Sequence, residues 1–217
     1  DPDSVHDRRI HQNEKMCAMH GDNSGVYQAM LILAEMNELA VNPAKAQYWR
    51  QKAETLRRNI FRYLWNGKFF VHQFPLNCLP LDDKENVRLS LSNPYDINRG
   101  VTNLEQSRAI IGEYLARKKK TAAFAEWFTI DPWYEKFCRE KPGTYINGAI
   151  SPFTAGELAK AALRNGYEEY GWEIIRRFMD MAERDGAVYF LYSPENSKPQ
   201  GGGPSAWGAA AFISAVD

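Results

Sequence analysis

The chain has 217 residues, enough to bury a core of its own, and its 27 basic residues balance 27 acidic ones. A net charge of zero disfavours nucleic acid, a polybasic membrane patch and a strongly anionic substrate as partners. The longest apolar runs fall far short of a membrane span, and no signal-peptide pattern is present. We therefore expect a soluble protein without nucleic-acid or membrane partners, and the composition favours no particular compartment.

The N-terminal segment, residues 1–22, reads as irregular and solvated. Its histidines and aspartates follow no spacing that fits a metal site, so we predict no metal and no cofactor. Cys17, Cys78 and Cys138 are odd in number and lack a CxxC pair, which disfavours a disulfide framework and a structural zinc site. Because the chain starts at Asp1 rather than Met, we expect a mature form or a piece of a longer protein.

Hydrophobic periodicity and cap signals predict about seven helices and two aromatic strands. One cap signal is Ser151-Pro152, with the serine as N-cap and proline in the first turn. Another is a capping box formed by Thr102 and Glu105. The expected helices span 26–40, 44–64, 103–116, 121–127, 153–163, 168–184 and 205–217, the strands span 68–74 and 187–192, and the long loops span 75–101, 128–142 and 195–204.

Two kinds of helix alternate along the chain. The helices at 26–40 and 153–163 are apolar nearly all round, which is typical of helices covered on every side. The helices at 44–64 and 168–184 are amphipathic, with charged residues on one face. The order of buried helix, break, amphipathic helix, glycine stop and strand repeats along the chain. We predict inner helices at 26–40, 103–116, 153–163 and 205–217.

This alternation predicts an all-α domain over residues 1–217, built from helical hairpins as in an (α/α)6 toroid with short rim strands. Inner helices of such a ring run the same way, so the loops that precede them meet at one mouth. These loops gather carboxylates, amides, Tyr and Trp, which suits recognition of a neutral sugar by ring stacking and hydroxyl contacts. They contain the sequences HGDN, NPYDINRG, FTIDPWY, GTYING and ENSKPQGGGPSAW.

Three ordered motifs carry a resemblance to a known family: Tyr145 to Pro152, Tyr192-Ser193-Pro194 and Ser205-Ala206-Trp207. Their order and spacing resemble those of the six-hairpin toroid glycosidases, especially the group around alpha-glucosidase I, mannosylglycerate hydrolase and trehalase. The resemblance implies a glycoside hydrolase fold and places this chain in its C-terminal part. A full toroid has twelve helices, so about seven imply an incomplete ring, which the remainder of its own chain or a second copy would complete.

The chain also departs from the family pattern. The resemblance implies that the family's general base, a Glu, falls at the position of Phe190 here. The family's general acid is an Asp upstream of the matching region, and Asp22-Asn23-Ser24 echoes its motif but lies too close to the first inner helix. The last segment ends without a C-cap signal, so we expect an open, half-closed toroid.

Glycoside hydrolysis needs two carboxyl groups that face one glycosidic bond. The candidates at the predicted mouth are Asp22, Asp96, Asp131 and Glu157. Turn or cap roles suit the three aspartates, whereas a carboxylate on a buried helix needs a partner, which makes Glu157 the most suggestive. We expect the walls of the sugar site, or packing between hairpins, to come from Asn98, Arg99, Trp133, Tyr145, Asn147 and Trp207.

Three alternatives stay open. A non-catalytic carbohydrate-binding or scaffold fragment fits Phe190 and the missing half of the ring. A toroidal polysaccharide lyase would use Tyr145 and Arg99 near an acidic sugar. A sugar epimerase would need histidines on inner helices, whereas the one histidine beyond the N-terminal segment is His72, in a predicted strand.

Overall fold

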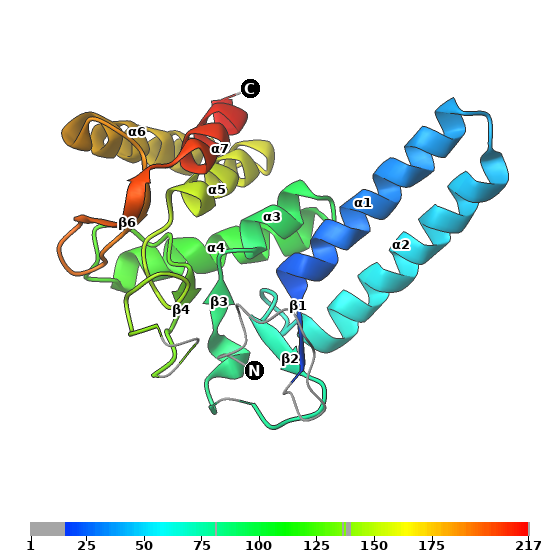
Figure 1. The fold of residues 1–217 in the computed structure, drawn as a ribbon, viewed down its shortest axis with the longest axis horizontal. Coiled ribbons are helices and arrows are strands. Elements are labelled where there is room, and N and C mark those ends of the chain that lie inside the picture. Colours follow the sequence, from blue (N-terminus) through cyan, green and yellow to red (C-terminus); the bar gives the residue numbers. More distant parts are fainter. Residues whose placement is uncertain (1–15, 81, 136, 138–139, 217) are drawn as a thin grey trace.

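The computed structural model describes residues 16–216 except 81, 136, 138 and 139. Within these residues the chain forms seven α-helices and three two-stranded antiparallel sheets (Figure 1). The strands pair β1 with β2, β3 with β4 and β5 with β6. The helices are α1 (His20–Leu39), α2 (Pro43–Leu64), α3 (Asn93–Asn98), α4 (Leu104–Lys120), α5 (Pro152–Arg164), α6 (Glu168–Asp185) and α7 (Ala206–Val216). The strands are β1 (Cys17–Met19), β2 (Gln73–Pro75), β3 (Leu89–Ser90), β4 (Ile130–Asp131), β5 (Tyr189–Tyr192) and β6 (Pro199–Pro204).

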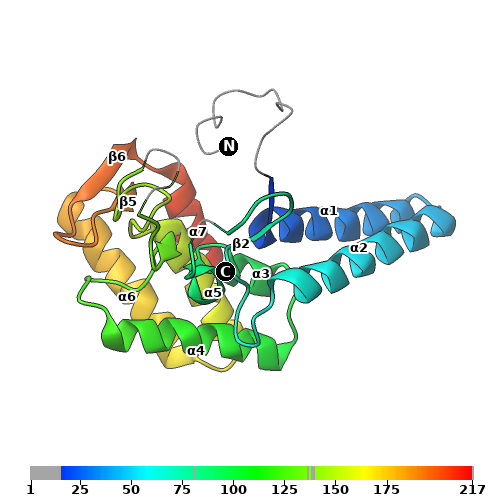
Figure 2. The same ribbon diagram turned by 90° about the horizontal axis from the view of Figure 1, so that it is seen from below.

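The helices form hairpins in two layers, as the alternation predicted. Helix α3 contacts both α1 and α5, and α5 contacts α7, so these four helices make an inner row. Helices α2, α4 and α6 pack on the outside of α1, α3 and α5, respectively (Figure 2). The predicted inner position of the helix at 103–116 is therefore wrong, because the short α3 occupies that place and α4 lies outside it.

The cap signals explain where several helices begin. Ser151 caps α5, with its hydroxyl accepting from the Thr154 backbone N–H at 3.2 Å, as predicted. The capping box of α4 is shifted by one residue from the predicted pair. Asn103 and Gln106 make it instead of Thr102 and Glu105, with reciprocal side chain to backbone hydrogen bonds of 2.9 and 3.0 Å.

Two loop predictions and one helix prediction are wrong. The predicted helix at 121–127 does not form, because its side chains serve long-range contacts: Glu126 accepts hydrogen bonds from Tyr170 and Arg177 of α6. Residues 93–98, predicted as loop, form α3 with Pro94 in its first turn. Part of the predicted loop 195–204 forms β6, which pairs with β5.

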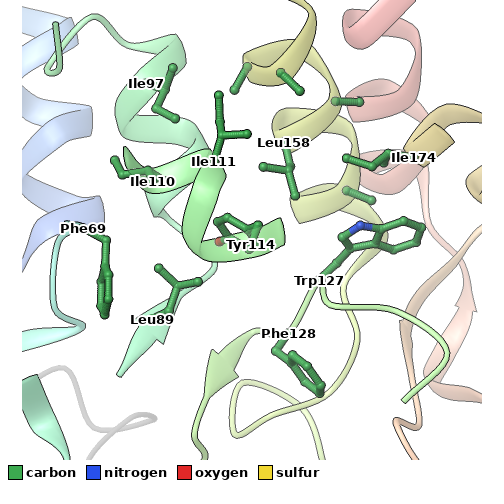
Figure 3. Packing of buried hydrophobic residues seen from close by; sticks show 14 of the residues in the cluster. Phe69, Leu89, Ile97, Ile110, Ile111, Tyr114, Trp127, Phe128, Leu158 and Ile174 are labelled. Carbon is green, nitrogen blue, oxygen red and sulfur yellow. The ribbon is translucent and has the colours of Figure 1, made fainter. Parts of the chain in front are cut away.

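The core lies between the inner row and the outer helices. It combines Ile97 of α3, Ile110 and Tyr114 of α4, Leu158 of α5 and Ile174 of α6 (Figure 3). Trp127 and Phe128 enter it from the segment between α4 and α5. The amphipathic prediction for 168–184 is confirmed, because its predicted apolar residues are buried: Tyr170, Ile174, Phe178 and Met181.

The α1–α2 hairpin extends as an arm from the rest of the molecule (Figures 1 and 2). Helix α1 takes an inner position, but the prediction that it is buried is wrong, since only His20, Ser24, Tyr27 and Ala34 are buried. Apolar residues on α1, among them Val26, Leu33 and Met36, are exposed. No other helix among the described residues covers that face of α1.

Candidate functional site

The inner helices α3, α5 and α7 bring a carboxylate, an amide and aromatic side chains together. Asn98 of α3 donates through Nδ2 to Glu157 Oε2 of α5 at 2.6 Å and to the Glu157 carbonyl oxygen at 2.9 Å. Tyr95, one turn earlier on α3, lies close enough for the negative charge of Glu157 to act on it: burial raises the pKa of the Tyr95 hydroxyl, and Glu157 raises it further. The predicted residues Asn98 and Glu157 are thus direct neighbours.

Two polar atoms beside Glu157 are buried without a hydrogen bond of good geometry within the described part of the chain: the Asn98 side-chain oxygen and the Tyr95 hydroxyl, which has Trp207 as its neighbour. Buried polar groups in folded proteins are nearly always hydrogen-bonded to protein or water. A hydroxyl and an amide oxygen next to a carboxylate offer donor and acceptor positions of the kind that sugar hydroxyls use.

An aromatic cluster borders this polar group. The rings of Phe153 and Trp207 stack with centroids 4.2 Å apart at an angle of 9°, and Phe190 lies 5.4 Å from Phe153. Tyr145 continues the series at 6.1 Å from Phe190. The side chains of Trp207 and Tyr145 are about half exposed, at 51% and 46%, so they present apolar surface to solvent. We call Tyr145, Phe153, Phe190 and Trp207 the aromatic platform.

Trp133 and Asn147 hold the loops next to the platform. Asn147 is fully buried, with Oδ1 accepting from the Tyr134 N–H at 2.8 Å and Nδ2 donating to the carbonyls of Tyr134 and Glu140. All these amide contacts are to backbone, which favours a structural role over sugar binding. Trp133 is partly exposed and packs on Gly148, where an added Cβ would lie 3.0 Å from the indole.

Arg99, at the end of α3, contacts the start of α1, where Asp22 lies. The guanidinium of Arg99 donates to the Gly21 carbonyl oxygen at 2.8 Å and to Ser24 Oγ at 2.7 Å, so it ties α1 to the end of α3. Asp22 is exposed in the first turn of α1, where a negative charge suits the helix dipole. A Cβ on Gly21 would clash with Ser92 Oγ, so the α1 start is pressed against the residue before α3.

Asp96 is fully buried and points away from solvent into a polar triplet. Its Oδ2 lies 2.5 Å from His20 Nδ1, and His20 Nε2 lies 2.6 Å from Ser90 Oγ. The order of groups is that of a Ser-His-Asp triad, but all three residues are buried, and the triplet joins α1, β3 and α3. These contacts favour a structural role for Asp96. The sequence offered no signal that His20 is its partner.

Asp131 lies elsewhere, at a cleft of about 400 Å³ on the side of α4. Its Oδ2 accepts from Arg117 Nε at 2.7 Å, and Arg117 also pairs with Glu113. The cleft lining contains none of the other predicted mouth residues. The structure therefore brings Glu157, Asn98, Tyr145 and Trp207 into one region and leaves Asp131 outside it.

His72 is also buried, which bears on the epimerase alternative. The Tyr134 hydroxyl donates to Glu85 Oε1 at 2.7 Å and so accepts from His72 Nδ1 at 2.8 Å. Burial lowers the pKa of His72 to about 3, and the neighbouring His20 and Arg88 act in the same direction. This histidine is a neutral core residue at physiological pH.

Sequence reasoning missed Tyr95, Phe153 and His20 as parts of this region. Tyr95 stood in the predicted loop NPYDINRG, and the aromatic pairing of Phe153 with Trp207 joins residues 54 positions apart. The sequence carried two relevant signals, the capping signal before Phe153 and the ordered motifs. They indicated that the helices of Phe153 and Trp207 begin at the same end of the helical row.

Comparisons with known proteins place the fold. No protein-family model matches the sequence, and no curated protein matches it. Among solved structures, the chain is similar to a GH63 mannosylglycerate hydrolase from Thermus thermophilus in complex with glucose, with a TM-score of 0.68 at 16% identity over 91% of this chain. It is also similar to a bacterial glucoamylase complexed with acarbose, with a TM-score of 0.64 at 14% identity over 94% of this chain.

The described helices therefore have the fold of part of an (α/α)6 toroid, as predicted, and are similar in fold to these two glycosidases. The chain spans 48% of the mannosylglycerate hydrolase and 34% of the glucoamylase, which is less than half of either. None of the helices in the described ranges is long and apolar enough to cross a membrane.

Proposed function

We propose that this chain forms the sugar-binding part of a glycosidase-type toroid, with Glu157 as an acidic group of the site and the aromatic platform as its stacking surface. The observation that carries the proposal is the contact of Asn98 with Glu157 beside the stacked rings of Phe153 and Trp207. The exposed face of Trp207 stacks on the apolar face of a sugar ring, and Glu157, Asn98 and Tyr95 form hydrogen bonds with the hydroxyl groups of that sugar.

The charge of the region favours a neutral sugar. Arg99 lies beside Tyr95, with its guanidinium 5.1 Å from the ring, and its Nη1 donates to the Gly21 carbonyl oxygen and to Ser24 Oγ. A carboxylate at Glu157, next to the binding surface, would repel a carboxylated sugar. For this reason we do not favour the polysaccharide lyase hypothesis, in which Arg99 would bind an acidic sugar.

Hydrolysis by the parent protein requires a second carboxyl group, about 5–5.5 Å from the first for retention or about 6.5–9.5 Å for inversion. Asp96 and Asp131 are held by His20 and Arg117, and Phe190 stands at the position that the resemblance assigns to the general base. We propose Asp22, which is exposed at the start of α1, or a carboxyl group from the rest of the ring as the second group.

A non-catalytic sugar-binding role is the second candidate, and Phe190 favours it. Phe190 packs in the aromatic platform 6.0 Å from Trp207, so a side chain that cannot exchange protons occupies this position in the site. Both candidates require the same sugar contact. They differ in whether the parent protein hydrolyses the bound glycoside.

We further propose that residues 1–217 belong to one toroid domain, whose ring is completed by further helices from the remainder of the chain. Four inner helices are described, and a six-hairpin ring has six. Both ends of the row carry exposed apolar residues, such as Met36 on α1 and Ile213 on α7. A second copy would supply four more inner helices rather than two, so we favour the remainder of the chain.

Binding of neutral sugars to the 217-residue chain tests the sugar site. Calorimetric titration with glucose, mannose and maltose should show binding that Trp207→Ala weakens about 10-fold, equivalent to about 1.4 kcal/mol. Trp172→Ala is the matched control, because Trp172 is equally exposed, at 52%, but lies on the outer helix α6. Equal affinities of Trp207→Ala and wild type, or no binding of any sugar, would contradict the proposal.

Activity of the longer parent protein separates the two candidates. Aryl glycosides and disaccharides should be hydrolysed by wild type, and Glu157→Gln should lower kcat by roughly 100-fold or more if Glu157 takes part in proton transfer. Sugar binding without turnover by the wild type would favour the non-catalytic candidate.

A further inference from the structure

Two cysteines lie at the same edge of the molecule, at the base of the arm. Cys17 is the first residue of β1, and Cys78 follows the end of β2 at Pro75. The two strands are antiparallel, with Cys17 opposite Pro75. The pairing continues beyond β2, where the Leu76 N–H donates to the Met16 carbonyl oxygen at 2.9 Å.

The two side chains are within reach of each other. The Cys78 thiol donates to the Met16 carbonyl oxygen, with 3.9 Å between sulfur and oxygen. Because a single peptide bond joins that carbonyl to Cys17, Cys78 Sγ lies within about 7 Å of Cys17 Cα. A disulfide needs Cα atoms about 4.4–6.8 Å apart, so the bond requires the segment after β2 to bring the Cys78 backbone within that distance of Cys17. A backbone hydrogen bond from Met16 to Asn77 Oδ1, 2.6 Å long, keeps this segment close to β1.

The two thiols differ in exposure, so we expect Cys17 to react with the oxidant first and Cys78 to react second. Cys17 is exposed and accessible to a small oxidant, whereas Cys78 is half-buried. Although the residue is exposed, partial desolvation of its sulfur raises the pKa of the Cys17 thiol, and the nearby Cys78 raises it further. The reactive thiolate of Cys17 is therefore scarce at neutral pH, and oxidation should become faster as the pH rises.

We propose that Cys17 and Cys78 form an intramolecular disulfide when the chain meets a low-molecular-weight disulfide such as oxidised glutathione. The Cys17 thiolate attacks one sulfur of the oxidant, its S–S bond breaks, and one glutathione thiolate leaves. The Cys78 thiolate then attacks the Cys17 sulfur of the mixed disulfide, and the second glutathione thiolate leaves. The protein loses two protons and two electrons, and the oxidant is reduced to two glutathione molecules.

The bond would close the base of the α1–α2 arm. Strand β1 leads directly into α1 at His20, and the segment that carries Cys78 follows β2. The same two strands and Leu76 line an apolar cavity of about 300 Å³ against α2, to which they contribute Ala18, Phe74 and Leu76. The disulfide would therefore fix one wall of this cavity and the start of α1. This inference is independent of the proposed sugar site.

Peptide mapping after oxidation tests the proposal. Treatment of the reduced chain with oxidised glutathione at pH 8, followed by digestion without reductant, should give a linked pair of peptides that contain Cys17 and Cys78, with a mass lower by two hydrogen atoms than the two free peptides. The Cys138→Ser variant should give the same linked pair, whereas Cys78→Ser should stop at glutathione bound to Cys17. The midpoint of thermal unfolding should rise by roughly 5–10 °C on oxidation and return on addition of dithiothreitol.

Two results would overturn the proposal. One is a wild-type chain in which glutathione stays on Cys17 while Cys78 remains open to alkylation. The other is a disulfide that joins either residue to Cys138 and disappears in the Cys138→Ser variant. Neither result would affect the sugar-binding proposal, because the two use different residues and different assays.

Discussion

Asp96 shows how a single buried carboxylate joins three elements. It is fully buried, lies 2.5 Å from His20 Nδ1 and connects α3 to the first residue of α1. We predict that Asp96→Asn lowers the free energy of unfolding by about 1–3 kcal/mol, as expected when a buried hydrogen bond is weakened and its partner is left less well satisfied. Urea unfolding of Asp22→Asn is the control, since this exposed change should stay within about 0.5 kcal/mol of wild type. Similar stability of the two variants would show that the Asp96 contact is unimportant.

His72 predicts a pH dependence of stability. Its folded-state pKa is about 3, below the value of 6.5 in the unfolded chain. Between these values the unfolded state binds more protons, so stability is complete above about pH 6.5 and is lost as the pH falls toward 3. The loss should be on the order of a few kcal/mol. His72→Gln should flatten the slope of unfolding free energy between about pH 6.5 and 5, where few carboxyl groups titrate. An unchanged slope would contradict the burial of a neutral His72.

The candidate site could be predicted from the sequence only in part. The sequence singled out Glu157 as a candidate because a carboxylate stands on an otherwise apolar helix, a local pattern that costs stability without a partner. Tyr95 and His20 were missed because their roles depend on contacts with residues far along the chain, which no local pattern encodes. Asn147 was a candidate because amide side chains often bind sugars. In the folded loop its side-chain amide is hydrogen-bonded to the backbone of Tyr134, a contact that the sequence does not reveal.

Helices α5 and α7 pack unusually closely at Gly156. An added Cβ there would lie 2.5 Å from the Ala211 backbone. We predict that Gly156→Ala forces the two helices apart and lowers the free energy of unfolding by about 1–3 kcal/mol. Gly112→Ala in α4 is the matched control, because nothing lies within 4 Å of its added Cβ, and it should stabilise by roughly 0.5–1 kcal/mol. Thermal unfolding of both variants measures this difference, and a stabilised Gly156→Ala would rule out the close approach.

The elements differ in how well their sequences specify them. The α5–α6 hairpin was predicted nearly to the residue because long periodicity agrees with caps at Ser151 and Gly186. Helix α3 was missed because six residues show no periodicity, and its Asn and Pro residues resemble a loop. Tertiary contacts determine the secondary structure of such short segments. The same holds for residues 121–127, where Glu126 accepts a hydrogen bond from Arg177 of α6.

At the scale of the whole molecule, the exposed apolar face of α1 is the most testable sign of an incomplete ring. Leu33 and Met36 are exposed at the arm, so their contribution to the stability of the chain alone should be small. We predict that Leu33→Lys with Met36→Lys changes the unfolding free energy by less than about 1 kcal/mol but lowers binding of a hydrophobic dye. In the longer parent protein the same change should destabilise strongly. Equal, small effects in both forms would show that no helix covers this face.

A crystal structure of the chain soaked with glucose or maltose would show whether a neutral sugar binds on the aromatic platform next to Glu157. We expect a sugar ring stacked on Trp207, with a hydroxyl in hydrogen-bond distance of Glu157 or Asn98. Sugar bound instead in the α4 cleft beside Asp131 and Arg117, with Trp207 uncovered, would contradict it.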